Sequence, residues 1–133
     1  MNQLSAVTLL VADYDEAIAW FVSKLGFVLI EDRPMSEAKR WVMIAPSIEA
    51  QTRLVLARAT GPGQIALVGQ QMGGRVGFFL QTSDFEGQYQ RMMEAGVTFR
   101  ELPRHEPYGK VVVFEDCYGN GWDLLEPAFT AMP

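Results

Sequence analysis

The chain of 133 residues contains one cysteine and one histidine, and this scarcity excludes several kinds of site. Cys117 has no second cysteine with which to form an internal disulfide, so a reducing, cytoplasmic compartment is expected. His105 stands alone in a predicted loop and leaves no Ser-His-Asp triad to assign. Neither a base nor a feature that lowers its pKa is visible for Cys117, so nucleophilic catalysis by its thiol is not expected.

Positive charge is also scarce, because 11 Lys and Arg residues oppose 16 Asp and Glu residues and the net charge is −5. A nucleic-acid partner is therefore not expected, since neutralising phosphates requires a basic surface. No apolar run approaches the length of a membrane span, and residues 1–5 lack the features of a signal peptide. The sequence thus predicts a cytoplasmic protein with neither a nucleic-acid nor a membrane partner.

The stretch 111–127 combines two apolar segments with a polar, glycine-rich turn between them, which is typical of a β-hairpin. The turn residues are Asp116, Gly119, Asn120 and Gly121. Side chains alternate along the second strand, so Asp123 and Leu125 share one face while Trp122 and Leu124 share the other. An acid therefore projects from the middle of an otherwise apolar strand, and its partner decides which chemistry is available.

The order of the predicted elements occurs twice. The first copy has strands at 4–11, 27–31, 40–44 and 52–58, and the second has strands at 75–80, 97–102, 111–114 and 122–126. A helix follows the first strand of each copy, capped by Asp13 or Ser83 and ended by Gly26 or Gly96, and these equivalent positions are 70 residues apart. The chain is therefore predicted to hold two β-α-β-β-β modules, 4–58 and 75–127, joined by a glycine-rich linker, 59–74.

Each predicted module forms a curved sheet whose helix covers only one face. The other face must be buried or must line a cavity. Pairing the two modules gives an α+β fold of the half-open-barrel type, with a concave and mostly apolar groove of the kind that holds small molecules. The linker permits pairing within one chain or exchange of modules between two chains.

Several segments carry a resemblance to a known family. They include Val7-Thr8-Leu9-Leu10-Val11-Ala12-Asp13, Lys24-Leu25-Gly26-Phe27, Glu94-Ala95-Gly96-Val97 and Phe114-Glu115-Asp116-Cys117-Tyr118-Gly119-Asn120. Together with the repeated modules, they resemble the vicinal oxygen chelate superfamily, which includes glyoxalase I, the bleomycin resistance proteins and the extradiol dioxygenases. The resemblance covers most of the chain and implies the fold, but one such scaffold hosts many activities.

The resemblance also implies where a metal ion would bind. Metal-using relatives place ligands on the first and last strand of each module, which correspond here to Ala6, Val55, Arg75 and Asp123. Ala6 and Val55 have no donor atoms, Arg75 is a permanent cation, and one carboxylate does not replace three or four ligands. No metal ion and no other cofactor is therefore expected.

Arg75 and Asp123 are expected to face the groove from neighbouring strands and to form an ion pair where the metal would be. Arg75 also presents a planar fork that suits a carboxylate or phosphate of a ligand. The alternative is a structural pair at the edge of the groove that touches no ligand.

Aromatic residues complete the predicted binding site. Alternation from Arg75 places Phe79 toward the groove and Phe78 under the helix, and Trp122 faces away from Asp123. Tyr108 lies in a Pro-Tyr-Gly turn at the predicted mouth, where relatives often carry an aromatic residue. The phase of Trp41 is open, and Val55 shares the predicted wall. The predicted ligand-binding residues are Arg75, Asp123, Phe79, Tyr108, Trp41 and Val55.

Two functions follow from these residues and from the resemblance. The first is a metal-independent, homodimeric binding protein that sequesters an aromatic or amphipathic small molecule, as in the bleomycin resistance branch. The second is a lyase- or dioxygenase-type enzyme with a non-standard metal or none, in which Asp123 is the base and Arg75 the clamp. The first ranks higher, because an adjacent arginine would lower the pKa that a base needs raised.

Overall fold

The computed structural model describes residues 1–128, which form two compact units. The first unit comprises Met1–Gln71 and the second begins at Met72. Both contain a sheet in which the first strand pairs in parallel with the last, and the other pairs are antiparallel. The predicted repeat of a β-α-β-β-β module is confirmed, and the two units share the same strand pairing.

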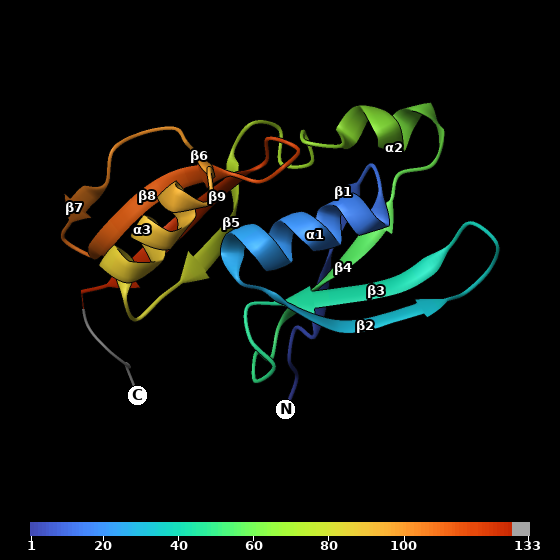
Figure 1. Cartoon of the computed structure of the whole chain (residues 1–133), viewed down its shortest axis with the longest axis horizontal. Coiled ribbons are helices and arrows are strands. Elements are labelled where there is room, and N and C mark those ends of the chain that lie inside the picture. The colour runs from blue at the N-terminus through green and yellow to red at the C-terminus, as the bar shows by residue number, and fades with distance from the viewer. Residues whose placement is uncertain (129–133) are drawn as a thin grey trace. The chain divides into compact units, whose positions relative to one another are not determined.

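The first unit has the strand order β1-β4-β3-β2. Its elements are β1 (Ala6–Val11), α1 (Tyr14–Leu25), β2 (Val28–Pro34), β3 (Arg40–Ala45), β4 (Arg53–Arg58) and α2 (Gly61–Leu67), shown in blue to green in Figure 1. As predicted, Asp13 caps α1, because its Oδ2 accepts a hydrogen bond from the backbone N–H of Glu16 at 2.8 Å. Gly26 ends the helix with φ of 75°, a left-handed conformation that glycine adopts without a Cβ clash.

The core of this unit lies between α1 and one face of the sheet. The buried face of α1 consists of Tyr14, Ala17, Phe21 and Leu25. The sheet contributes Leu9, Val42, Ile44 and Leu56, of which none is more than 1% exposed. Each fully buried aliphatic or aromatic side chain contributes about 1.5–3 kcal/mol relative to an exposed one. Burial of these side chains therefore holds α1 on one face of the sheet and leaves the opposite face open.

The second unit has the strand order β5-β9-β8-β6, with β7 also paired to β8. Its elements are β5 (Val76–Gln81), α3 (Phe85–Glu94), β6 (Thr98–Phe99), β7 (Arg104–Glu106), β8 (Gly109–Glu115) and β9 (Gly121–Pro127). Asp84, and not the predicted Ser83, caps α3, because its side chain accepts from the N–H of Gly87. Glu126 supports the same helix end by accepting from the N–H of Phe85 at 2.7 Å.

The predicted strand 97–102 is wrong in its extent, because the chain leaves the sheet after β6 and returns as β7. Pro103 has no N–H to donate at this point. The carboxylate of Glu101 instead accepts from the N–H of Val113 on β8 at 3.0 Å. A side chain thus takes over one ladder hydrogen bond of the interrupted strand.

The predicted linker 59–74 contains a helix that the sequence analysis did not predict. In α2 every residue is exposed, so little tertiary packing supports it. Gln71 then reaches back to β1, where its Oε1 accepts from the N–H of Leu10 at 2.9 Å and its Nε2 donates to the carbonyl of Thr8 at 2.7 Å. Because β1 is an edge strand, this side chain occupies backbone groups that a neighbouring strand would otherwise pair.

The predicted hairpin turn between β8 and β9 is confirmed, and Asp116 organises it. Its Oδ1 accepts from the N–H groups of Tyr118 and Asn120 at 2.9 and 3.1 Å. Its Oδ2 accepts from Asn120 Nδ2 at 2.9 Å and from Trp122 Nε1 at 3.0 Å. Asp116 is only 5% exposed, and these hydrogen bonds offset the cost of burying its carboxyl group.

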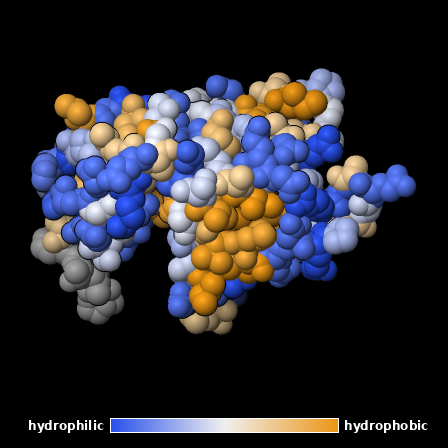
Figure 2. Space-filling view, viewed as in Figure 1, coloured by the Kyte–Doolittle hydropathy of each residue, from blue (hydrophilic) through white to orange (hydrophobic). Residues whose placement is uncertain are grey.

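Hydrophobic side chains also reach the surface of the first unit. Figure 2 shows them gathered where Figure 1 places the C-terminal end of α1 and the start of β2, and the exposed apolar residues of these two elements include Val22 and Leu29. This surface belongs to the helix layer and not to the open face of the sheet.

Within residues 1–128, none of the helices combines the length and the hydrophobicity that crossing a membrane requires.

Candidate functional site

The open face of the first unit's sheet carries the two predicted wall residues. Val42 pairs with Leu56 and both side chains are buried toward α1. Residues one position away point to the opposite face, so Trp41 lies on the same face as Val55. The phase of Trp41, which the sequence left open, is therefore outward from α1, and both side chains are half-buried.

A pocket of about 370 Å³ lies at the end of this sheet where β3 begins and β4 finishes. Trp41, Val55 and Ala57 contribute to its wall from the sheet, and Tyr14 from the start of α1. Gln64 of α2 and Thr60, the residue before α2, border the pocket, so the predicted linker supplies part of the lining. The pocket thus combines an aromatic and aliphatic wall with polar groups at its rim.

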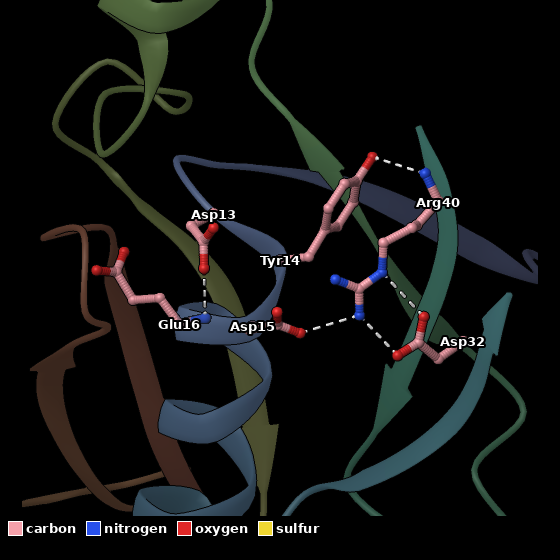
Figure 3. A network of polar contacts seen from close by, with 6 residues as sticks. All are labelled: Asp13, Tyr14, Asp15, Glu16, Asp32 and Arg40. Atoms are coloured by element: carbon pink, nitrogen blue, oxygen red, sulfur yellow. Dashed lines mark hydrogen bonds and ion pairs between the residues drawn. The ribbon is translucent and has the colours of Figure 1, made fainter. Parts of the chain in front are cut away.

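A polar network beside this pocket joins α1 to the sheet (Figure 3). The guanidinium of Arg40 forms ion pairs with Asp32 at 2.7 Å and with Asp15 at 3.0 Å. These carboxylates, Asp32 first, raise the pKa of Arg40 above its usual range, so it remains a cation. The backbone N–H of Arg40 also donates to the hydroxyl of Tyr14 at 3.3 Å. The charge of Arg40 is therefore already compensated within the unit.

In the second unit, the predicted alternation of β5 and β9 is confirmed for the aromatic residues. Phe78 and Trp122 are buried and stack with their ring centres 4.6 Å apart. Phe79 pairs with Asp123 across the two parallel strands, so both lie on the opposite, open face. Phe79 is 66% exposed, which makes it an uncovered aromatic ring beside a carboxylate.

Asp123 is a carboxylate that lacks a full set of partners. Its Oδ1 is buried and accepts no hydrogen bond from the described residues. Burial raises the pKa of Asp123, the positive charge of Arg104 opposes this, and the negative charge of Glu101 adds to it. A buried, unpartnered oxygen is costly, so a hydrogen-bond donor brought by another molecule would stabilise Asp123.

Arg104 lies near Asp123 but is held by other groups. Its Nε donates to both oxygens of Glu101 at 3.0 Å. Hydrogen bonds to Glu101 and then to Tyr108 raise the pKa of Arg104. Tyr108 is 53% exposed in the turn between β7 and β8, so its predicted position in a turn is confirmed.

The expected ion pair between Arg75 and Asp123 does not form. Arg75 precedes β5, is exposed, and makes no ion pair with any residue of the described range 1–128. The physical reason is an irregularity at Gly77: Val76 pairs with Gly121, and Phe78 already pairs with Trp122. The extra residue shifts the alternation, so the phase that Phe79 shares with Asp123 cannot be extended back to Arg75.

The four positions at which the resemblance implied metal ligands do not offer a set of donor atoms that suits a metal ion. Ala6 on β1 and Val55 on β4 carry no donor atoms, and Arg75 lies outside the strand. Across residues 1–128, no three side chains of His, Cys, Asp or Glu come together in a group that would hold a metal ion. Asp123 alone is insufficient, because a metal ion needs three or four protein ligands.

Sequence reasoning missed the residues that connect these elements. Glu101 and Arg104 approach Asp123 only because the predicted strand 97–102 is interrupted, and no residue spacing along the chain indicates this interruption. Gln64 and Thr60 lie in the predicted linker, for which the sequence analysis predicts no helix. The sole signal for α2 was Pro62, which favours the first turn of a helix.

Comparison with known proteins places this geometry in a family. An uncharacterised protein of Shewanella frigidimarina (strain NCIMB 400) is 50% identical over 121 residues, which cover 90% of this chain and 90% of that protein. The crystal structure of UcmS2 matches with a TM-score of 0.82 and 31% identity, covering 94% of this chain and 98% of that one. TnmS3, an antibiotic binding protein from Streptomyces sp. CB03234, matches with a TM-score of 0.77 and 29% identity over 96% and 98% of the two chains.

The same assignment follows from a family profile. The profile of the Glyoxalase/Bleomycin resistance protein/Dioxygenase superfamily matches residues 3–124, which is nearly the whole described chain. The chain belongs to the Glyoxalase/Bleomycin resistance protein/Dioxygenase superfamily.

Proposed function

We propose that this protein binds an aromatic or amphipathic small molecule without the help of a metal ion. The observation that carries the proposal is the pocket of about 370 Å³ whose wall includes Trp41 and Val55. Its volume is within the range of roughly 300–1,000 Å³ that ligand pockets occupy. The similarity to TnmS3, an antibiotic binding protein, makes antibiotics the first compounds to test.

Aromatic surface supports the same proposal in the second unit. Phe79 is uncovered, and removing apolar surface from water yields about 25 cal/mol per Å². Asp123 beside it offers an acceptor, and Tyr108 and Arg75 are further exposed groups that a ligand contacts in this proposal. The poverty of metal donors supports binding by side chains alone.

Assembly is part of the proposal. A homodimer is expected from the resemblance to the bleomycin resistance branch, whose members share each groove between two chains. Sedimentation velocity of the purified protein measures this directly. A monomer at all concentrations that still binds ligand would remove the homodimer from the proposal and leave binding intact.

The first experiment is a thermal-shift screen against antibiotics and aromatic acids. A ligand at a hundredfold excess over its Kd should add about 2.7 kcal/mol to the free energy of unfolding. Trp41→Ala should weaken binding of the hits, whereas Trp20→Ala, on α1 and outside the pocket lining, should not. A screen without any stabilising compound, or hits that bind equally well to Trp41→Ala, would overturn the proposal.

The metal-independent part has its own test. Binding of a hit should be unchanged after dialysis against a chelator and after addition of Ni²⁺, Zn²⁺, Mn²⁺ or Fe²⁺. A divalent ion that copurifies stoichiometrically and is required for binding would contradict it.

Catalysis is the second candidate function, and Asp123 is the observation that favours it. An acid whose pKa is raised by burial and whose Oδ1 has no partner is suited to take up or release a proton. Arg75 forms no ion pair with Asp123, so the opposing effect of a nearby arginine on this pKa comes from Arg104 and is smaller than the effect of burial. Mass spectrometry of bound hits after incubation tests this, and Asp123→Asn should stop turnover while leaving binding measurable.

A further inference from the structure

The pocket of the first unit is bordered by positive charge, although the chain as a whole is acidic. Its lining includes three cations, Lys39, Arg40 and Arg58, and no aspartate or glutamate. The net charge of the chain is −5, so this clustering runs against the average composition. The pocket is therefore more positive than the composition of the chain predicts.

Two of these cations are not compensated within the unit. Arg40 is occupied by Asp15 and Asp32, as described above. Lys39 and Arg58 make no ion pair with any side chain in the part of the molecule that the structure describes. Their charges remain available to an anion that enters the pocket.

Gln64 adds a neutral donor of defined orientation. Its Oε1 accepts from the backbone N–H of Thr60 at 2.9 Å and from the Thr60 hydroxyl at 3.2 Å. A backbone N–H requires an oxygen opposite it, which fixes which end of the amide is which. Nε2 is thereby left as a donor, and it has no hydrogen-bond partner among residues 1–128.

We propose that this pocket binds an aromatic carboxylic acid, with the ring against Trp41 and the carboxylate near Arg58, Lys39 and the Nε2 of Gln64. The proposal rests on the proposed function and names the ligand class for the same pocket. A carboxylate accepts hydrogen bonds from both guanidinium and amide donors, and charged acceptors form the stronger bonds. The volume of about 370 Å³ suits a ligand of one or two rings.

The test compares 2-naphthoic acid with 2-naphthamide, which has nearly the same shape and no charge. Isothermal titration of the full chain should give about fivefold or greater preference for the acid, equivalent to one modest charge contact. Raising the salt concentration from 50 to 500 mM should reduce this preference, because the contributing charges lie near the surface. Equal binding of acid and amide, while either binds, would overturn the proposal.

Arg53 provides a matched control for Arg58. Both arginines lie on β4 and neither forms an ion pair within residues 1–128, but Arg53 borders a separate hollow that also contains Glu49. Arg58→Gln should remove most of the preference for the acid, and Arg53→Gln should preserve it. Equal loss in both variants would show that net charge alone is responsible and would overturn the proposal.

A second variant keeps the proposal testable if Arg58→Gln folds poorly. Gln64→Glu retains an oxygen for Thr60 but replaces the donor by an anion, so it should weaken 2-naphthoate and spare 2-naphthamide. If neither probe binds while an antibiotic hit does bind through Trp41, the aromatic-acid inference fails and the proposed function stands. If neither the probes nor any screened compound bind, both fail.

Discussion

The guanidinium of Arg40 lies 5.0 Å from the centre of the Tyr14 ring, while the backbone N–H of Arg40 donates to the Tyr14 hydroxyl. This double contact joins the first residue of α1 to the first residue of β3. Both residues line the pocket, so the contact also holds its rim. The ring and the hydroxyl can be separated by mutation, because phenylalanine retains one and lacks the other.

Tyr14→Phe should lower the free energy of unfolding by about 0.5–1.5 kcal/mol, the net worth of one hydrogen bond. Tyr14→Leu should cost more, since it also removes a contact of a cation with an aromatic face worth about 0.5–1 kcal/mol. Urea denaturation measures both. Tyr89→Phe is the control, because no hydrogen bond of its hydroxyl is found in residues 1–128. A Tyr14→Phe variant as stable as Tyr89→Phe would contradict the role of the hydroxyl.

Asp116→Asn should destabilise the protein by about 1.5–3 kcal/mol, the range for hydrogen bonds to a charged group. Both carboxylate oxygens accept hydrogen bonds. In asparagine, an NH2 group would replace one of these oxygens and would face N–H donors with which it cannot form a hydrogen bond. The Nε1–H of Trp122 is among them, and its fluorescence reports the change during thermal unfolding. A neutral effect would show that the turn does not depend on this carboxylate.

Asp123→Asn is the same chemical change on the same hairpin, but it should raise the free energy of unfolding at neutral pH, whereas Asp116→Asn should lower it. Burial raises the pKa of Asp123 above the ordinary 3.8, so the native state holds the proton to higher pH than the unfolded state. The free energy of unfolding therefore falls as pH rises from 3.8 through the raised pKa, and asparagine avoids this loss. The Tm advantage of the variant should be present at pH 7 and should disappear below pH 3.8. An advantage that is independent of pH would contradict the assignment.

Gln71→Ala should expose one edge of β1. The Leu10 amide loses the Gln71 oxygen that accepts its hydrogen bond, so its hydrogen exchange should accelerate. The two lost hydrogen bonds should together lower the free energy of unfolding by about 1–3 kcal/mol. Gln70→Ala, one residue away and without a side-chain hydrogen bond within residues 1–128, should leave Leu10 exchange unchanged. Unaltered exchange of the Leu10 amide in Gln71→Ala would contradict the proposal that Gln71 protects the edge of β1.

Gly77→Ala should destabilise the second unit by about 1–3 kcal/mol, because an added Cβ would overlap the side chain of Met72. Met72→Ala should cost little, since Met72 is 38% exposed. The double variant should recover much of the loss, and a double-mutant cycle in denaturant measures this coupling. Additive effects would show that the two side chains do not compete for the same space.

The repeated modules and their caps could be predicted because they depend on local spacing. Asp13 and Gly26 act at the two ends of α1 through groups only a few residues away. Ser83 was the wrong cap, because Asp84 competes at the adjacent position and Glu126 arrives from a distant strand. Trp122 faces away from Asp123 as alternation predicted. Phe79 lies on the predicted face although the count from Arg75 was wrong, because the pairing of β5 with β9 is regular only from Phe78 onward.

The sequence by itself determined the two-module fold and the hairpin turn around Asp116, since periodicity and turn chemistry are local properties. The tertiary structure decided the partners of the charged residues. One extra residue at Gly77 separated Arg75 from Asp123, and one interrupted strand brought Arg104 near Asp123 in its place. Ion pairs depend on strand register, and register changes with single irregularities that residue spacing does not reveal.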